Sequence, residues 1–187
     1  IEIDLGGKTV QIKDFGFAQT GGDLFVWLPE EKVMWMGNPV VAEAPAIPWL
    51  LDGHMLETLD TLQAVYDFLP EGSTIVPGHS LPTSIDALKW NIDYLKEAKK
   101  LVGISVEEGL SKDDTIKAVP MDEFRGYALF DWLHPSINLP AAWDDLSKLS
   151  GDENHEEANK TKKSSKNSGG ALFSMLILSL LLVKRNK

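Results

Sequence analysis

Cysteine is absent from this 187-residue chain, which excludes disulfide bonds, thiolate nucleophiles and cysteine-ligated metal sites. Basic residues are scarce up to residue 149, where 11 Lys and Arg face 24 Asp and Glu, and the net charge is −13, whereas the rest carries +3. Because an acidic surface repels phosphate backbones, we expect no nucleic-acid partner. The sequence also has no Gly-rich phosphate loop and no internal repeat, and only four histidines.

One of the four histidines follows a short strand. Residues 73–76 (Ser-Thr-Ile-Val) are rich in β-branched side chains that suit a buried strand, and Pro77-Gly78 ends it directly before His79. An imidazole fixed at the end of a strand can be aimed, as a metal ligand or a general base requires. The alternative is a turn histidine that only packs, and this segment alone leaves both open.

The rest of the pattern mixes strands with helices and predicts an α/β (α+β) fold. Strands are predicted over residues 1–5, 8–15, 23–28 and 33–36, and helices over 55–69 and 85–102, with a shorter helix within 106–119. Ser84 and Ser111 have the chemistry of helix N-caps, and His54 is expected to cap or flank the helix that follows it. Asn138 as a cap and Pro140 as an early helical residue are predicted to open the last helix.

Residues 18–79 resemble the metallo-β-lactamase-fold hydrolases. In that family the order is His-Thr-x-Gly-Asp, strand, Pro-Glu-x-Lys turn, strand, Gly-Asp, helix, and strand-Pro-Gly-His. The matching segments here are Gln19–Asp23, Pro29–Lys32, Gly37-Asn38 and Pro77-Gly78-His79. The resemblance implies that residues 1–149 form the C-terminal half of an αββα sandwich. Because no histidines form the family's upstream His-x-His-x-Asp-His segment, we expect the chain to be the C-terminal portion of a longer protein.

The resemblance assigns three metal-ligand positions, which are Gln19, Asn38 and His79 in this sequence. It implies one or two zinc ions as cofactor, with catalysis by a metal-bound water whose pKa falls to about 7. Two of the positions depart from the family's His and Asp, and a neutral amide is a poor zinc ligand. Gln19 and Asn38 can still hydrogen-bond to a water or a substrate, which makes them candidate catalytic residues in a positioning role.

The substrate pocket is predicted in two further segments. Residues 39–53 form an apolar loop with three prolines, in which Trp49 and Leu50 offer an apolar wall. The alternative is that this loop packs against the expected N-terminal half. Residues 126–143 also resemble the C-terminal stretch of the same hydrolases, and they place His134 either near the mouth of the site or in the packing.

The composition changes at about residue 150. Residues 150–168 are first acidic, then basic and Ser-rich, and are predicted to be a disordered linker. Gly169 and Gly170 precede the uncharged residues 171–183 and a basic end. At 1.5 Å per residue a helix over 171–183 would span roughly 20 Å, so the predicted short membrane helix is marginal against a hydrocarbon core of roughly 30 Å.

This ending resembles the Gly-Gly C-terminal sorting signals of certain Gram-negative bacteria. The resemblance implies that residues 169–187 are a sorting and transmembrane segment, that residues 171–183 contact the membrane, and that a rhomboid-type protease is a partner. It also implies export, with a transient stay in the inner membrane before delivery to the periplasmic face or cell surface. The alternative is a plain tail anchor.

Three functions follow from these patterns. The first is an exported metal-dependent hydrolase with an altered metal site, acting on a small-molecule ester, thioester, amide or phosphoester. The second is a catalytically inactive binding module on the same scaffold. The third is a membrane-anchored interaction protein whose acidic face recruits a cationic partner.

Overall fold

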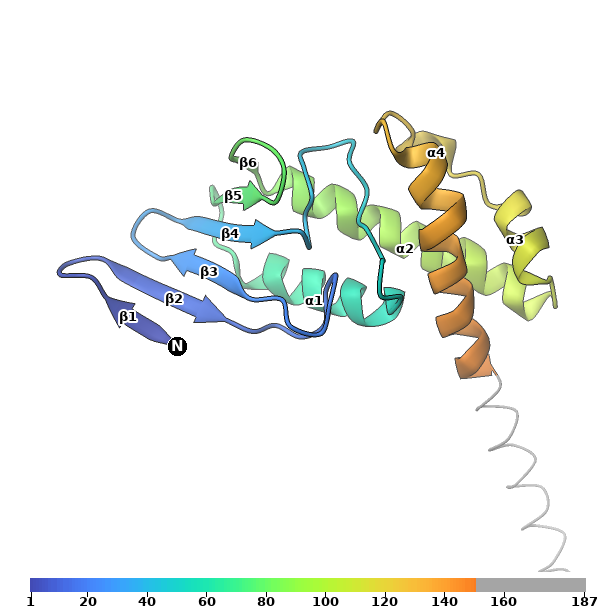
Figure 1. Cartoon of the computed structure of the whole chain (residues 1–187), viewed down its shortest axis with the longest axis horizontal. Helices are drawn as coiled ribbons and strands as arrows, with labels where there is room; N and C mark the ends of the chain where they lie inside the picture. The colour runs from blue at the N-terminus through green and yellow to red at the C-terminus, as the bar shows by residue number, and fades with distance from the viewer. Residues whose placement is uncertain (151–187) are drawn as a thin grey trace, which may run out of the picture. The chain divides into compact units, whose positions relative to one another are not determined.

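Six strands form one mixed sheet whose spatial order is the order of the chain. The computed structural model describes residues 1–150; the predicted sorting segment and the predicted linker beyond residue 150 lie outside the described residues. The strands are β1 (Glu2–Asp4), β2 (Thr9–Lys13), β3 (Phe25–Leu28), β4 (Val33–Gly37), β5 (Thr74–Pro77) and β6 (Thr83–Ser84). Neighbouring strands are antiparallel except β4 and β5, which run parallel (Figure 1).

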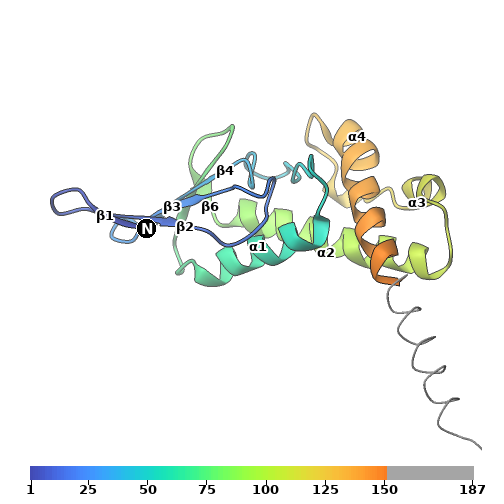
Figure 2. The ribbon, with the colours of Figure 1, turned by 60° about the horizontal axis from the view of Figure 1, so that its bottom comes forward.

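Two helices, α1 (Met55–Phe68) and α2 (Asp86–Glu107), cover one face of this sheet (Figure 2). Met55, Leu59, Leu62 and Val65 recur at helical spacing on α1 and are buried, as their periodicity predicts. The side chains that alternate toward the helices are buried with them: Phe25, Trp27, Met34, Met36 and Ile75. This interface is the hydrophobic core beneath the candidate site.

The opposite face of the sheet is apolar as well. Val26 pairs with Ile12 on one side and with Trp35 on the other, and Trp35 pairs with Val76, so all four point away from the helices. Trp35 is 44% exposed. In the part of the chain that the structure describes, α1 and α2 lie on the other side and no helix covers this face (Figure 2). Strands that are apolar on both faces are typical of a sheet buried between two layers.

The remaining helices follow α2 in the chain. They are α3 (Lys112–Ala118), the 3₁₀ turn η1 (Asp122–Phe124), α4 (Phe130–Leu133) and the π-helical turn η2 (His134–Asn138), after which residues 139–150 stay helical. None of the helices within residues 1–150 combines the length and the apolar character needed to cross a bilayer.

The predicted element types are confirmed, and the mixed α/β fold with them, but three details were wrong. The helix predicted to stop at residue 102 continues to Glu107. Ser84 lies one residue before the cap position, although its hydroxyl accepts a hydrogen bond from the Asp86 amide (3.2 Å). Asn138 does not open the last helix, because that helix begins at Phe130 and passes through Asn138 within a π turn. Ser111 is confirmed as a cap, since its hydroxyl accepts from the Asp114 amide.

Candidate functional site

The topology of the sheet brings the three predicted ligand positions to the same end. Because β4 and β5 are parallel, Asn38 and His79 both follow the carboxyl ends of their strands. Because β3 is antiparallel to β4, the segment that leads into β3 and contains Gln19 starts from that end too. Three segments far apart in sequence therefore lie at one end of the sheet (Figure 1).

Asn38 and His79 are held by direct contacts between their loops. The Gly78 N–H donates to the Val40 carbonyl (3.1 Å), and the His79 N–H donates to the Val41 carbonyl (2.8 Å). The Asn38 side chain packs against Gly78 so closely that a Cβ atom there would overlap its Oδ1, and would lie 3.1 Å from the Asn38 backbone nitrogen. Glycine at position 78 thus lets the amide of Asn38 approach the peptide that carries His79.

Gly78→Ala is expected to destabilise the protein by about 1–3 kcal/mol, because the added methyl group must displace Asn38 or the loop that holds it. Gly22→Ala is the matched control, since a Cβ atom at Gly22 would meet nothing within 4 Å. Urea unfolding of both variants measures the difference. Equal stability of the two variants would contradict the close packing of Asn38 on Gly78.

Two buried N–H groups at this site have no hydrogen-bond partner among the described residues. They are Nε2 of Gln19, a residue that is 7% exposed, and Nε1 of Trp49. A buried donor without a partner costs about 1–3 kcal/mol, so such groups are normally satisfied by something. Both are donors, and donors suit the oxygen of a ligand rather than a cation.

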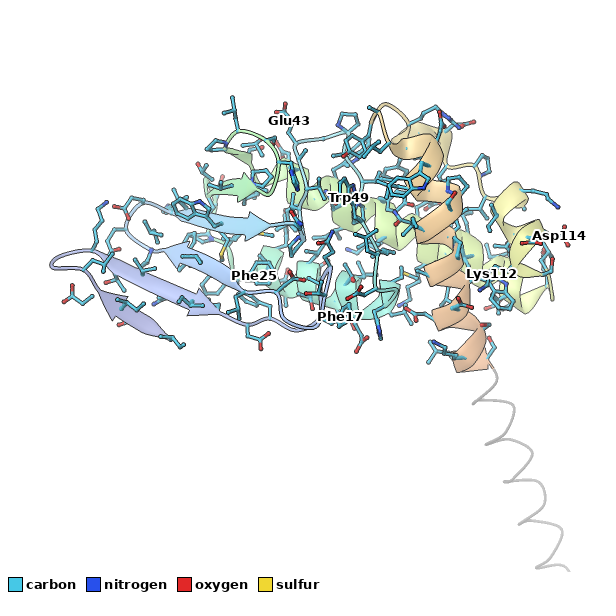
Figure 3. The ribbon with its side chains drawn as sticks, viewed as in Figure 1. Phe17, Phe25, Glu43, Trp49, Lys112 and Asp114 are labelled. Carbon is cyan, nitrogen blue, oxygen red and sulfur yellow. The ribbon has the colours of Figure 1, made fainter. Side chains whose placement is uncertain are left out.

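Trp49 and Leu50, the predicted apolar wall, are placed differently by the structure. The indole of Trp49 is half-buried and stacks on the imidazole of His79, with ring centroids 6.0 Å apart and planes at 21°. Figure 3 shows Trp49 in the segment between β4 and α1, beyond the end of the sheet. The Leu50 side chain is 2% exposed and belongs to the hydrophobic core. Trp49 therefore borders His79. The Leu50 side chain packs in the core, and only its backbone N–H takes part in a hydrogen bond near the site.

His134 lies in the packing of the helices. It is 4% exposed, its Nε2–H donates to the Val119 carbonyl (2.8 Å), and its Nδ1 lies 2.9 Å from the Tyr94 hydroxyl. Burial lowers the pKa of His134. Both ring nitrogens already form hydrogen bonds within residues 1–150, so neither is available to a substrate.

The structure adds one residue, Asn138, to the site, and it places His54 outside it; sequence patterns assigned both residues to helix ends. Asn138 accepts a hydrogen bond from the Leu50 amide (3.2 Å) and donates to the Pro48 carbonyl (2.8 Å), on either side of Trp49. His54, the residue before α1, packs against Phe17, with ring centroids 4.3 Å apart and ring planes at 39°. No local pattern could have found these contacts, because each joins segments distant in the sequence.

The residues present do not by themselves fit a zinc site. Within residues 1–150, no group of three or more His, Cys, Asp or Glu side chains is placed to hold a metal ion. His79 supplies one imidazole, and the neighbouring positions supply amides, which zinc disfavours. Further ligands would have to come from outside residues 1–150.

No protein-family model matches the chain. Among solved structures, it is similar to a metallo-beta-lactamase from Pontibacter korlensis (20% identity, 51% of this chain and 45% of that protein, TM-score 0.46). It is also similar to a metallo beta lactamase from Hirschia baltica (14% identity, 51% and 42%, TM-score 0.41). The matched part is thus less than half the length of either protein.

Proposed function

We propose that the chain forms the C-terminal half of a metal-dependent hydrolase of the metallo-β-lactamase superfamily with an altered metal site. The observation that carries this proposal is the convergence of Gln19, Asn38 and His79 at one end of the sheet, in the order that the sequence motifs predict. The closely packed Gly78 supports it, because that glycine fixes Asn38 next to His79.

The open face of the sheet supports the half-domain part of the proposal. Ile3, Val10, Ile12, Val26, Trp35 and Val76 form an apolar surface, to which the described helices contribute no cover. A second sheet packed on it would complete an αββα sandwich and would bury these side chains. The polypeptide that carries this second sheet would also supply the remaining metal ligands.

Each side chain then has a role at the sheet end. The His79 imidazole is the one zinc-type ligand, and the N–H of Gln19 donates to an oxygen of the substrate. The indole of Trp49 forms an apolar wall beside His79. An ester, thioester, amide or phosphoester presents an oxygen acceptor of the kind that this donor lacks. The cofactor in this proposal is zinc, as one or two ions.

A binding module is the second candidate, and a specific observation favours it. Two of the three ligand positions carry amides, and one amide has a buried N–H with no partner among residues 1–150. Hydrogen-bond donors can bind an acceptor ligand without any metal. This candidate keeps the scaffold and the ligand contacts but has no hydrolytic activity.

Metal analysis of the full-length protein separates the two. We expect about one zinc per chain after purification without chelators, and His79→Ala is expected to lose it. His54→Ala is the matched control, since it removes an exposed imidazole that already contacts Glu57. Less than one zinc per chain, unchanged by His79→Ala, would leave the binding module as the function.

The proposal extends to location. We propose that the protein is exported, that residues 169–187 act as a sorting segment cut by a rhomboid-type protease, and that residues 171–183 contact the membrane. A surface-bound interaction protein with an acidic face would show the same location without activity. Protease treatment of intact cells is expected to digest the folded part. If the folded part is protected inside the cytosol, export is contradicted.

A further inference from the structure

A chain of buried hydrogen bonds connects the last helix to the segment that carries Trp49. His134 and Asn138 lie one helical turn apart in η2, and Tyr94 reaches both of them from α2. Asn138 is 1% exposed and Tyr94 is fully buried. Beyond Asn138 the chain of bonds ends on the peptide groups of Pro48 and Leu50.

The chemistry of the two ends fixes the direction of every bond. The Val119 carbonyl can only accept, so Nε2 of His134 carries a proton, and in the neutral ring, which burial favours, Nδ1 is bare. Nδ1 therefore accepts from the Tyr94 hydroxyl (2.9 Å), whose oxygen accepts from Nδ2 of Asn138 (3.1 Å). Nδ2 also donates to the Pro48 carbonyl, which leaves Oδ1 of Asn138 to accept from the Leu50 amide. Each donor thus has an acceptor.

We propose that Asn138 is a positioning residue, which clamps the peptide groups on both sides of Trp49 and so holds the indole against His79. The two peptide groups fix the orientation of the Asn138 amide, and its second N–H donates to Tyr94. The proposal rests on the proposed function only in treating His79 as the site residue that Trp49 borders. The clamp acts through the backbone, because the bonds go to Pro48 and Leu50 and none goes to the indole itself.

The direction of the bond from the Tyr94 hydroxyl to His134 requires an uncharged imidazole. A proton on Nδ1 would face the Tyr94 hydroxyl hydrogen, and two donors cannot share one bond. The groups that surround the imidazole are the Tyr94 hydroxyl from α2, Asp122 and Glu123 from η1, and Arg125 directly after it. Burial and Arg125 lower the pKa of His134, whereas the Val119 carbonyl and the two carboxylates raise it, and the net direction is down.

Nuclear magnetic resonance of the full chain without metal tests the clamp. Asn138→Ala is expected to speed hydrogen exchange of the Leu50 amide at least tenfold and to shift the ring protons of His79, as the indole moves. Asn91→Ala is the matched control. Asn91 is also 1% exposed, but its amide donates to the carbonyls of Ala46 and Ala87 and makes no bond to the residues adjacent to Trp49. Equal changes at Leu50 and His79 in both variants would overturn the proposal.

Tyr94→Phe tests the remaining link with a variant that removes only a hydroxyl. We expect the nitrogen shifts of the His134 ring to change while the Leu50 amide stays protected, since Asn138 keeps its bonds to the loop. If His134 of the wild type carries its proton on Nδ1, the assigned directions of its hydrogen bonds are wrong. None of these signals requires zinc, so a protein without metal can fail the proposed function and still show the clamp.

Discussion

Asn38→Asp is expected to raise the affinity of the full-length protein for zinc. The substitution conserves shape, so the carboxylate should occupy the place of the amide against Gly78 and next to the peptide of His79. It replaces a weak ligand with a negative oxygen donor that zinc prefers. Since outer-shell partners already contribute roughly 10–100-fold, a new ligand should contribute at least about tenfold. Isothermal titration with zinc measures the gain.

The double variant Asn38→Asp with His79→Ala is the informative control for this gain. If the carboxylate and the imidazole bind the same ion, removal of the imidazole cancels most of the gain in affinity. If they act independently, the effects of the two substitutions on the binding free energy add. Gln63→Glu adds the same charge on α1, away from the end of the sheet, and is expected to leave zinc affinity unchanged. A gain that survives His79→Ala would place the metal elsewhere and would contradict the proposed site.

Local patterns were sufficient for most of the fold. The strand before His79 and the stripe of Met55, Leu59 and Leu62 depend on neighbouring residues, so period and turn chemistry predicted them. The end of α2 was missed because Gly103 weakens a helix. The helix continues because Val102 and Ser105, on either side of that glycine, are buried in the packing.

The site was predictable only in part. Its order of loops follows from the sequence motifs, but the contacts that shape it join residues 88 and 90 positions apart, as in the bonds from Asn138 to Leu50 and Pro48. Asn138 is a residue type typical of helix caps, and only in the tertiary fold does its buried amide bind the peptide groups beside Trp49. The packing of Asn38 on Gly78 likewise exists only once two loops meet.

His134→Ala is expected to lower the free energy of unfolding by about 3 kcal/mol or more, the range for removal of a buried ring. The ring stacks on Phe130, with centroids 4.8 Å apart, and its loss would leave the Tyr94 hydroxyl and the Val119 carbonyl without a partner. His54→Ala removes a side chain that is 48% exposed and is expected to change stability by no more than about 0.5 kcal/mol. Urea unfolding at pH 7.5 compares them.

The same imidazole makes stability depend on pH in a defined direction. In the unfolded chain His134 titrates near pH 6.5, and in the folded protein its pKa is lower because the ring is buried. As the pH falls below about 6.5, the unfolded state binds a proton that the folded state does not, so the free energy of unfolding decreases until the pH reaches the lowered pKa. Above pH 6.5 this contribution is fully present.

His134→Gln keeps a polar side chain but cannot titrate, so unfolding curves between pH 5 and 7.5 are expected to show a smaller slope in this variant than in the wild type. The carboxyl groups of Asp4, Glu31 and Asp114, whose pKa is lowered by hydrogen bonds, lose their contribution only as the pH falls below their ordinary pKa values of 3.8 to 4.5, outside this window. If the slopes of wild type and His134→Gln coincide, the ring is already charged or solvated in the folded protein, and the direction assigned to the bond between Tyr94 and His134 fails with it.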